Sequence, residues 1–150
     1  MDLPKLVFSA PGEPPFSIDA LVEEEDSYLS LSAEPFLEMP AEHPLRVMTA
    51  AREAEEIEPG TVVVRQGDPL KLLAVIHRLN VSPTLQEAWV VRAIENLCVE
   101  VERRQIRALG TPLLGTVHGT MSPPRSFELL GPLLAEETGL QRIWIVRSSG

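Results

Sequence analysis

Apolar and polar positions follow two different periodicities along this chain. Short runs of apolar, often β-branched residues bounded by proline, glycine or acidic residues are typical of buried strands, whereas apolar residues that recur every three or four positions are typical of helices. The short runs predict strands at residues 6–8, 18–22, 61–64, 72–77, 106–109 and 143–146. The helical periodicity predicts helices at residues 45–57, from residue 84 to residue 103, and from residue 122 onward.

The order of these elements predicts the fold class. Strands and helices alternate in the second half of the chain, which favours a parallel or mixed sheet covered by helices on both faces. Residues 66–69 combine turn-forming residues between two strand-like runs, so we expect the flanking strands to be antiparallel neighbours. At 150 residues the chain has the length of one domain with a real core, and we expect residues 1–150 to form a single domain.

Capping residues mark the helix boundaries. Thr84 and Glu87 have the spacing of a capping box at the start of the longest helix. Ser122, followed by two prolines, predicts the start of the next helix, which the pair at residues 131–132 (Gly-Pro) should divide into two short pieces. Gly139 is expected to end the second piece.

Four consecutive acids, residues 23–26 (Glu-Glu-Glu-Asp), follow the predicted strand at 18–22. Charge runs usually mark exposed surface, so we expect a solvated loop here. A carboxylate cluster that binds a cation is the alternative, although the run lacks the alternating spacing and glycine of a calcium loop. Residues 27–44, interrupted by three prolines, are expected to form a long irregular loop.

Composition limits the classes of function. Hydrophobic residues make up 44% and charged residues 23% of the chain, and the mean hydropathy is near zero, as in folded globular proteins. The net charge of −9 disfavours binding to nucleic acid, since the field would repel phosphates over most of the surface. We find no apolar run long enough to span a membrane and no signal-like start, so we expect a cytoplasmic protein without membrane contact.

Two residues with reactive side chains have ordinary structural explanations. Cys98 falls within the apolar pattern of the longest helix, where a small core residue is expected rather than a nucleophile. His77 ends an apolar run, and no Ser, Cys or Asp pattern around it suggests a catalytic partner. We therefore expect His77 to be a hydrogen-bonded interior residue, and we expect neither a catalytic residue nor a cofactor or metal site.

The stretch from residue 105 to residue 131 carries the strongest functional signal. It predicts a buried strand, a glycine-rich loop and the start of a helix. Small residues in such a loop let backbone N–H groups approach an anion near the positive end of the helix. Glycines also serve ordinary tight turns, so a phosphate contact and a plain turn both remain possible.

Several motifs resemble those of the macro domain, an α/β/α module whose members bind ADP-ribose and sometimes hydrolyse its derivatives. Residues 59–64 (PGTVVV), 75–77 (VIH) and 84–96 carry the resemblance, followed by 112–116 (PLLGT) with Gly119 as the family's second phosphate loop. Residues 19–22 (DALV) are similar to the family's Asp-Ala-Ile-Val strand. The resemblance implies a three-layer α/β/α fold with a central mixed, largely parallel sheet.

The resemblance also implies a set of ligand-binding residues. The backbone amides of the glycine loop would hold phosphate, and the side chains of Thr116 and His118 would add donors. The carboxylate of Glu13 or Asp19 would contact the base of the nucleotide. The five loop residues are Gly115, Thr116, Val117, His118 and Gly119. The family usually has Asn-Ala-Ala-Asn where this chain has its acidic run, and a triple-glycine loop that residues 27–44 lack. Hydrolase members use such asparagine and glycine features. The sequence therefore favours binding without catalysis.

Three hypotheses follow from the sequence. The leading one is non-catalytic binding of ADP-ribose or a related phosphorylated nucleotide through the glycine-rich strand–loop–helix. The alternative is a macro-like fold that acts as a protein-interaction or structural module, with a protein partner on the acidic run and the proline-rich segment at 32–44. Metal-dependent hydrolysis at residues 23–26 is a third hypothesis, which lacks ligand histidines nearby.

Overall fold

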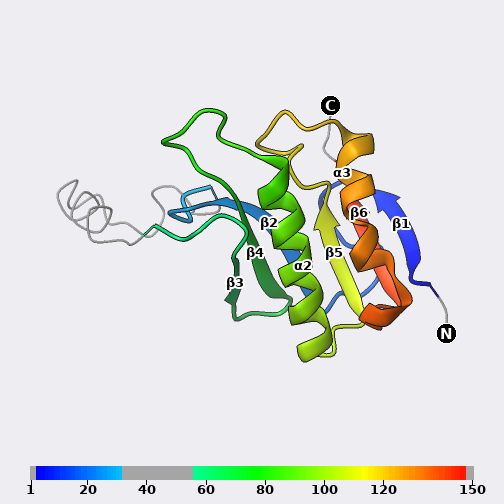
Figure 1. Cartoon of the computed structure of the whole chain (residues 1–150). Helices are drawn as coiled ribbons and strands as arrows, with labels where there is room; N and C mark the ends of the chain where they lie inside the picture. Colours follow the sequence, from blue (N-terminus) through cyan, green and yellow to red (C-terminus); the bar gives the residue numbers. More distant parts are fainter. Residues whose placement is uncertain (1–2, 32–55, 148–150) are drawn as a thin grey trace.

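The computed structural model describes residues 3–31 and 56–147. Within these residues one six-stranded sheet has the order β1-β6-β5-β2-β4-β3, and every neighbouring pair is parallel except β3 with β4 (Figure 1). The strands are β1 (Lys5–Ser9), β2 (Ala20–Asp26), β3 (Val62–Arg65), β4 (Leu70–His77), β5 (Ala108–Pro112) and β6 (Arg142–Val146). The predicted mixed, largely parallel sheet is confirmed.

Helices pack against one face of this sheet. Helix α2 (Glu87–Arg103) and helix α3 (Pro123–Leu129) lie on the same side, and the short 3₁₀ helices η1 (Gly131–Leu134) and η2 (Glu136–Thr138) follow α3 (Figure 1). The buried face of α2 comprises Val90, Ala93, Ile94, Leu97 and Val101. These side chains share a core with Val22, Leu72, Ala74 and Ile76, which alternate along β2 and β4 as residues on one face of a sheet must.

Strands β2 and β5 separate toward their carboxyl ends. Strand β2 pairs with β4 along its whole length but with β5 only through Ala20 and Leu21. The chain leaves β2 toward β3 and β4, and it leaves β5 in the opposite direction, toward β6. This is a topological switch point, where open α/β sheets have a crevice at the carboxyl ends of the strands.

Most predicted elements are confirmed. The turn at residues 66–69 joins antiparallel strands, α3 ends before the Gly-Pro pair, and Gly139 takes a left-handed φ of 77° after η2. Ser122 caps α3 through its hydroxyl, which accepts a hydrogen bond from the Arg125 N–H. The predicted helix at 45–57, apart from its last two residues, and the part of the long loop from residue 32 onward lie outside the described residues.

Two predictions about local structure are wrong. The acidic run is not a solvated loop but the second half of β2, because it pairs with β4 in parallel register and its carboxylates have partners inside the protein. Helix α2 begins at Glu87 rather than at Thr84, and its N-cap, Gln86, makes no side-chain capping bond. The Thr84 carbonyl accepts a hydrogen bond from the Arg78 N–H instead, and Leu85 forms a β-bridge with His77, so the chain enters the helix only after Gln86, whose backbone is extended.

No helix in the described part of the chain has the length and apolar composition needed to cross a membrane.

Candidate ligand-binding cleft

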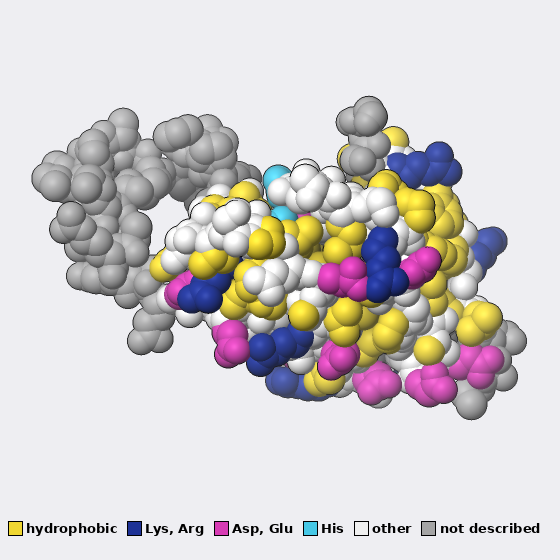
Figure 2. All heavy atoms as spheres, turned by 45° about the horizontal axis from the view of Figure 1, so that its top comes forward, with side chains coloured by type: hydrophobic (Ala, Val, Ile, Leu, Met, Phe, Trp, Pro, Cys, Tyr) yellow, Lys and Arg dark blue, Asp and Glu magenta, His cyan; other side chains and the backbone are white. Residues whose placement is uncertain are grey.

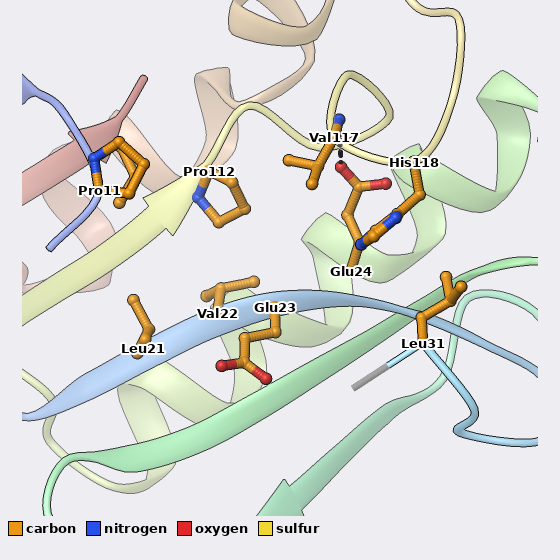
Figure 3. A pocket seen from close by; sticks show the side chains of 10 residues that line it. Pro11, Leu21, Val22, Glu23, Glu24, Leu31, Pro112, Val117 and His118 are labelled. Carbon is orange, nitrogen blue, oxygen red and sulfur yellow. Dashed lines mark hydrogen bonds between the residues drawn. The ribbon is translucent and has the colours of Figure 1, made fainter. Parts of the chain in front are cut away.

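A cavity of about 550 Å³ lies at the carboxyl ends of the central strands, where β2 and β5 separate (Figure 3). Its wall comprises Pro11, Leu21, Val22, Glu23, Glu24, Leu31, Pro112, Val117, His118 and Val146. Most of these side chains are apolar, and no Lys or Arg is among them. The cavity thus combines an apolar wall with the glycine-rich loop at its rim.

Glu24 connects the floor of the cavity to the loop. Its Oε2 accepts a hydrogen bond of 2.9 Å from the Val117 N–H, and its Oε1 lies 2.7 Å from Nε2 of His77. Both side chains are essentially inaccessible to solvent, at 0% for Glu24 and 1% for His77. In Figure 3 the Glu24 side chain rises from β2 toward Val117. The Val117 N–H, which the sequence analysis assigned to phosphate, therefore already donates a hydrogen bond to the Glu24 carboxylate.

The other acids of the run also have partners. The Glu25 carboxylate accepts a hydrogen bond of 2.7 Å from the Leu31 N–H, and the Asp26 carboxylate accepts one of 2.7 Å from the Tyr28 N–H. These bonds shape the turn that leaves β2. Glu23 points away from Glu24 (Figure 3). Its carboxylate forms an ion pair of 2.9 Å with Lys71. In the described part of the chain, no three His, Cys, Asp or Glu side chains come together as a metal site would require.

The glycine loop is held mainly by its own backbone. The Thr116 N–H donates to the Leu113 carbonyl at 3.1 Å, the Thr116 hydroxyl donates to the same carbonyl at 2.6 Å, and the Met121 N–H donates to the Gly115 carbonyl at 3.1 Å. Gly115 has a φ of 87°. Among hydrogen bonds between described residues, none uses the N–H of Gly115, His118 or Gly119. The loop therefore has three N–H groups that donate no hydrogen bond within the described part of the chain.

His118 is the exposed polar side chain at the rim. It contributes to the cavity wall, and its ring meets that of buried His77 edge-on with 6.3 Å between the centroids. Histidine atoms reach the surface among uncharged atoms, and no Lys or Arg atoms adjoin them on the face shown in Figure 2. The expectation that His77 is a hydrogen-bonded interior residue is confirmed.

The structure brings only part of the predicted ligand set to the cavity. Val117 and His118 line it, and Gly115, Thr116 and Gly119 shape the same loop. Glu13 is exposed in the segment after β1 and is not part of the cavity wall. Asp19 is also absent from the wall, and its Oδ2 accepts hydrogen bonds of 3.0 Å from the N–H groups of Arg107 and Ala108 at the start of β5. A contact of either acid with a base remains a prediction.

The sequence analysis missed the pairing of Glu24 with His77. A usable signal was present, because the acids continue a predicted strand without a break and His77 ends another strand-like run. Parallel neighbours place such ends at the same edge of a sheet. The signal was not specific, since nothing in the sequence fixed β2 and β4 as neighbours.

Comparisons with known proteins support the fold. The sequence matches no model of a protein family and no curated protein. The macrodomain of Thermus aquaticus DarG has a similar structure, with a TM-score of 0.67 at 15% identity over 94% of this chain and 97% of that one. The Oceanobacillus iheyensis macrodomain with ADP gives 0.59 at 14% identity over 89% and 78%. A variant of that protein with ADP-ribose gives 0.59 at 15% identity over 88% and 78%.

Proposed function

We propose that this chain, which has the macrodomain fold, binds ADP-ribose or a related nucleotide in the cavity between β2 and β5 without transforming it. The observation that carries this proposal is the cavity itself, which opens at the switch point of the sheet beside the glycine-rich loop. Its volume of about 550 Å³ lies within the usual range of small-molecule sites. Structures of a similar fold with ADP and with ADP-ribose support this choice of ligand class.

The chemistry of the wall suggests how such a ligand would lie. The apolar side chains of Leu21, Pro112 and Val146 offer surface for a base and the carbon face of a ribose. The N–H groups of His118 and Gly119, together with the His118 imidazole, lie on the loop where a polar end of the ligand would meet donors. The apolar wall would thus supply affinity, and the loop would supply orientation.

Binding without catalysis is consistent with the hydrogen bonding of Glu24 and the position of His77. Each oxygen of the Glu24 carboxylate is already in a hydrogen bond, and the side chain is inaccessible to solvent. His77 does not line the cavity. A general base must come within hydrogen-bond reach of a substrate proton, and neither group is placed to do so.

A protein-interaction module is the second candidate, and two observations favour it. The Val117 N–H is satisfied within the protein, which removes one donor from the loop. Val117 is 46% exposed, and the segment after β4 exposes two more large apolar residues, Leu79 at 52% and Val81 at 36%. Exposed apolar side chains near one edge are typical of surfaces that contact other proteins.

Calorimetric titration separates the two candidates. We expect adenosine, AMP and ADP-ribose to release heat with the wild-type protein. Replacement V146W should fill the cavity and abolish binding, whereas the matched replacement V99W, on the exposed face of α2, should leave binding unchanged. If none of the three ligands binds at millimolar concentration, the ligand proposal fails and the interaction module is favoured.

A further inference from the structure

The buried carboxylate of Glu24 lies where the glycine loop would receive an anion. Its Oε2 accepts the hydrogen bond of the Val117 N–H at 2.9 Å, and a backbone N–H has only one proton to donate. We propose that Glu24 is a built-in substitute for the anion and sets the specificity of the cavity against phosphate at the loop. This inference rests on the proposed function and narrows its ligand class, to nucleosides and nucleotides whose phosphates stay away from the Val117 N–H.

The surroundings hold Glu24 in this role. The side chain projects from β2 on the face that carries Val22 and α2, and His77 of neighbouring β4 fixes its second oxygen at 2.7 Å. The loop packs against the same histidine, since a Cβ at Gly119 would lie 3.3 Å from Cε1 of His77. Glu24, His77 and the loop therefore form one packed unit, in which the carboxylate cannot turn away without leaving His77 and Val117 unpaired.

Among the described residues of the cavity wall, no cationic Lys or Arg side chain compensates for the missing donor. The second acid of the wall, Glu23, adds another carboxylate, whose partner is Lys71. A phosphate oxygen near Val117 would meet a like charge in a partly apolar setting, where repulsion is poorly screened. The N–H groups of Gly115, His118 and Gly119 would remain as loop donors, without that of Val117.

The ligand class follows from this balance. A neutral nucleoside would fill the apolar part of the cavity. Its hydroxyl groups are uncharged donors, which the carboxylates of Glu23 and Glu24 do not repel. Each added phosphate brings charge toward Glu24. We therefore expect the wild-type protein to bind adenosine at least as tightly as AMP, and AMP more tightly than ADP, which is the reverse of the order for a loop with free amides.

The test is calorimetry of the full chain with adenosine, AMP, ADP and inorganic phosphate, in the wild type and in variants E24A and E24Q. Removing the carboxylate frees the Val117 N–H, and a hydrogen bond to a charged group accounts for about 10-fold to 100-fold in affinity. We expect E24A to bind ADP at least 10-fold more tightly than the wild type, with adenosine affinity changed less than threefold. E24Q, which loses the charge but keeps an acceptor, should show a smaller gain.

Variant E23Q is the matched control, because Glu23 also lines the cavity but its carboxylate is paired with Lys71 and does not contact the loop. We expect less than a threefold change in ADP affinity. The inference is overturned if folded E24A and E24Q bind ADP and inorganic phosphate no better than the wild type does. If E24A fails to fold because His77 loses its partner, the ADP affinity of E24Q tests the inference instead: a gain supports it, and the absence of a gain overturns it.

The outcomes also separate this inference from the proposed function. If the wild type binds no nucleoside but E24A or E24Q gains binding of ADP or phosphate, the role of Glu24 stands and the function fails. If the wild type binds adenosine but neither variant gains ADP affinity, the function stands and the role of Glu24 is excluded.

Discussion

His77 and Glu24 form a buried pair whose removal should be costly. Their hydrogen bond is 2.7 Å long, and both side chains are essentially inaccessible to solvent. Replacement H77A leaves the Glu24 carboxylate without one partner in a buried setting, which should lower the free energy of unfolding by about 3 kcal/mol. Urea denaturation measures this, with H118A as the control: His118 is exposed, and its loss should cost less than about 0.5 kcal/mol. Equal stability of the two variants would contradict the structural role of the pair.

Cys98 offers a pH-dependent prediction. Burial raises the pKa of its thiol from 9.0 to about 11, and the charges of Glu102 and Glu95 add to the shift. Because the folded state favours the protonated thiol, this contribution to stability is full below pH 9 and is lost as the pH rises to about 11. At pH 8 a thiol reagent should modify the native protein at least about 10-fold more slowly than the denatured protein, since the thiolate fraction is smaller. Equal rates would show that the thiol is not shielded.

The acidic run shows where inference from single residues succeeds and fails. Charge predicted exposure for residues 23–26, yet Glu25 and Asp26 are fully buried. The rule failed because it counts charges and not partners, and these carboxylates accept hydrogen bonds from Leu31 and Tyr28 a few positions further along the chain. His77, by contrast, was predicted to be interior because it ends an apolar run, and such runs report burial directly.

At the level of elements, the loop between β5 and α3 depends on Gly119. A Cβ there would lie 2.6 Å from the Gly115 carbonyl oxygen and 2.8 Å from Cδ2 of Leu85, which is closer than real contacts allow. Variant G119A should therefore lose about 1–3 kcal/mol of stability. The control is G131A, where a Cβ meets no atom within 4 Å and the change should be within about 0.5 kcal/mol. Thermal unfolding of both variants checks this, and equal melting temperatures would mean that the loop adopts another conformation.

The amino ends of β2 and β5 are joined by Asp19. Its carboxylate accepts two backbone N–H groups, from Arg107 and Ala108, at 3.0 Å. Variant D19A should lower the free energy of unfolding by about 1 kcal/mol, a modest value because this edge is partly exposed. Adenosine affinity should stay within twofold, because Asp19 does not line the cavity.

Variant E13A tests the other acid that the sequence assigned to a base. Glu13 is exposed and outside the cavity wall, so we expect neither stability nor adenosine affinity to change. A folded D19A or E13A that loses more than fivefold in affinity would instead restore the predicted contact with a base.

Element boundaries were harder to predict than element types. The apolar periodicity of α2 identified the helix, but Thr84 and Glu87 suggested a cap that the structure does not use. A capping motif describes local preference alone, and here pairing with the end of β4 outweighs it. Ser122 does cap α3, where no strand competes for the same residues.

For the whole molecule, alternation of strands and helices with a few turn signals was sufficient to predict a mixed sheet, and the motif resemblance gave its family of folds. The site could not be derived in the same way. Whether a loop amide is free depends on which side chain from another strand reaches it, and Glu24 is 93 positions away from Val117 in the sequence. The fold depends on many weak and redundant sequence signals, whereas a single contact decides whether one backbone N–H is already hydrogen-bonded within the protein.

The net charge of the molecule allows a last prediction, which concerns ionic strength. With 22 acidic and 13 basic residues, the chain has a net charge of −9, and the field of this net charge repels an anionic ligand. Salt screens that field, since the Debye length falls from roughly 30 Å at 0.01 M to about 10 Å at 0.1 M. ADP affinity should therefore rise by about threefold between 20 mM and 300 mM salt, opposite to the trend for basic phosphate-binding sites. Adenosine is neutral and serves as the control, with affinity unchanged over the same range. If ADP affinity falls with salt, the loop amides generate a local positive potential that outweighs the field of the whole molecule, and the order of ligand preference proposed for the cavity would be reversed with it.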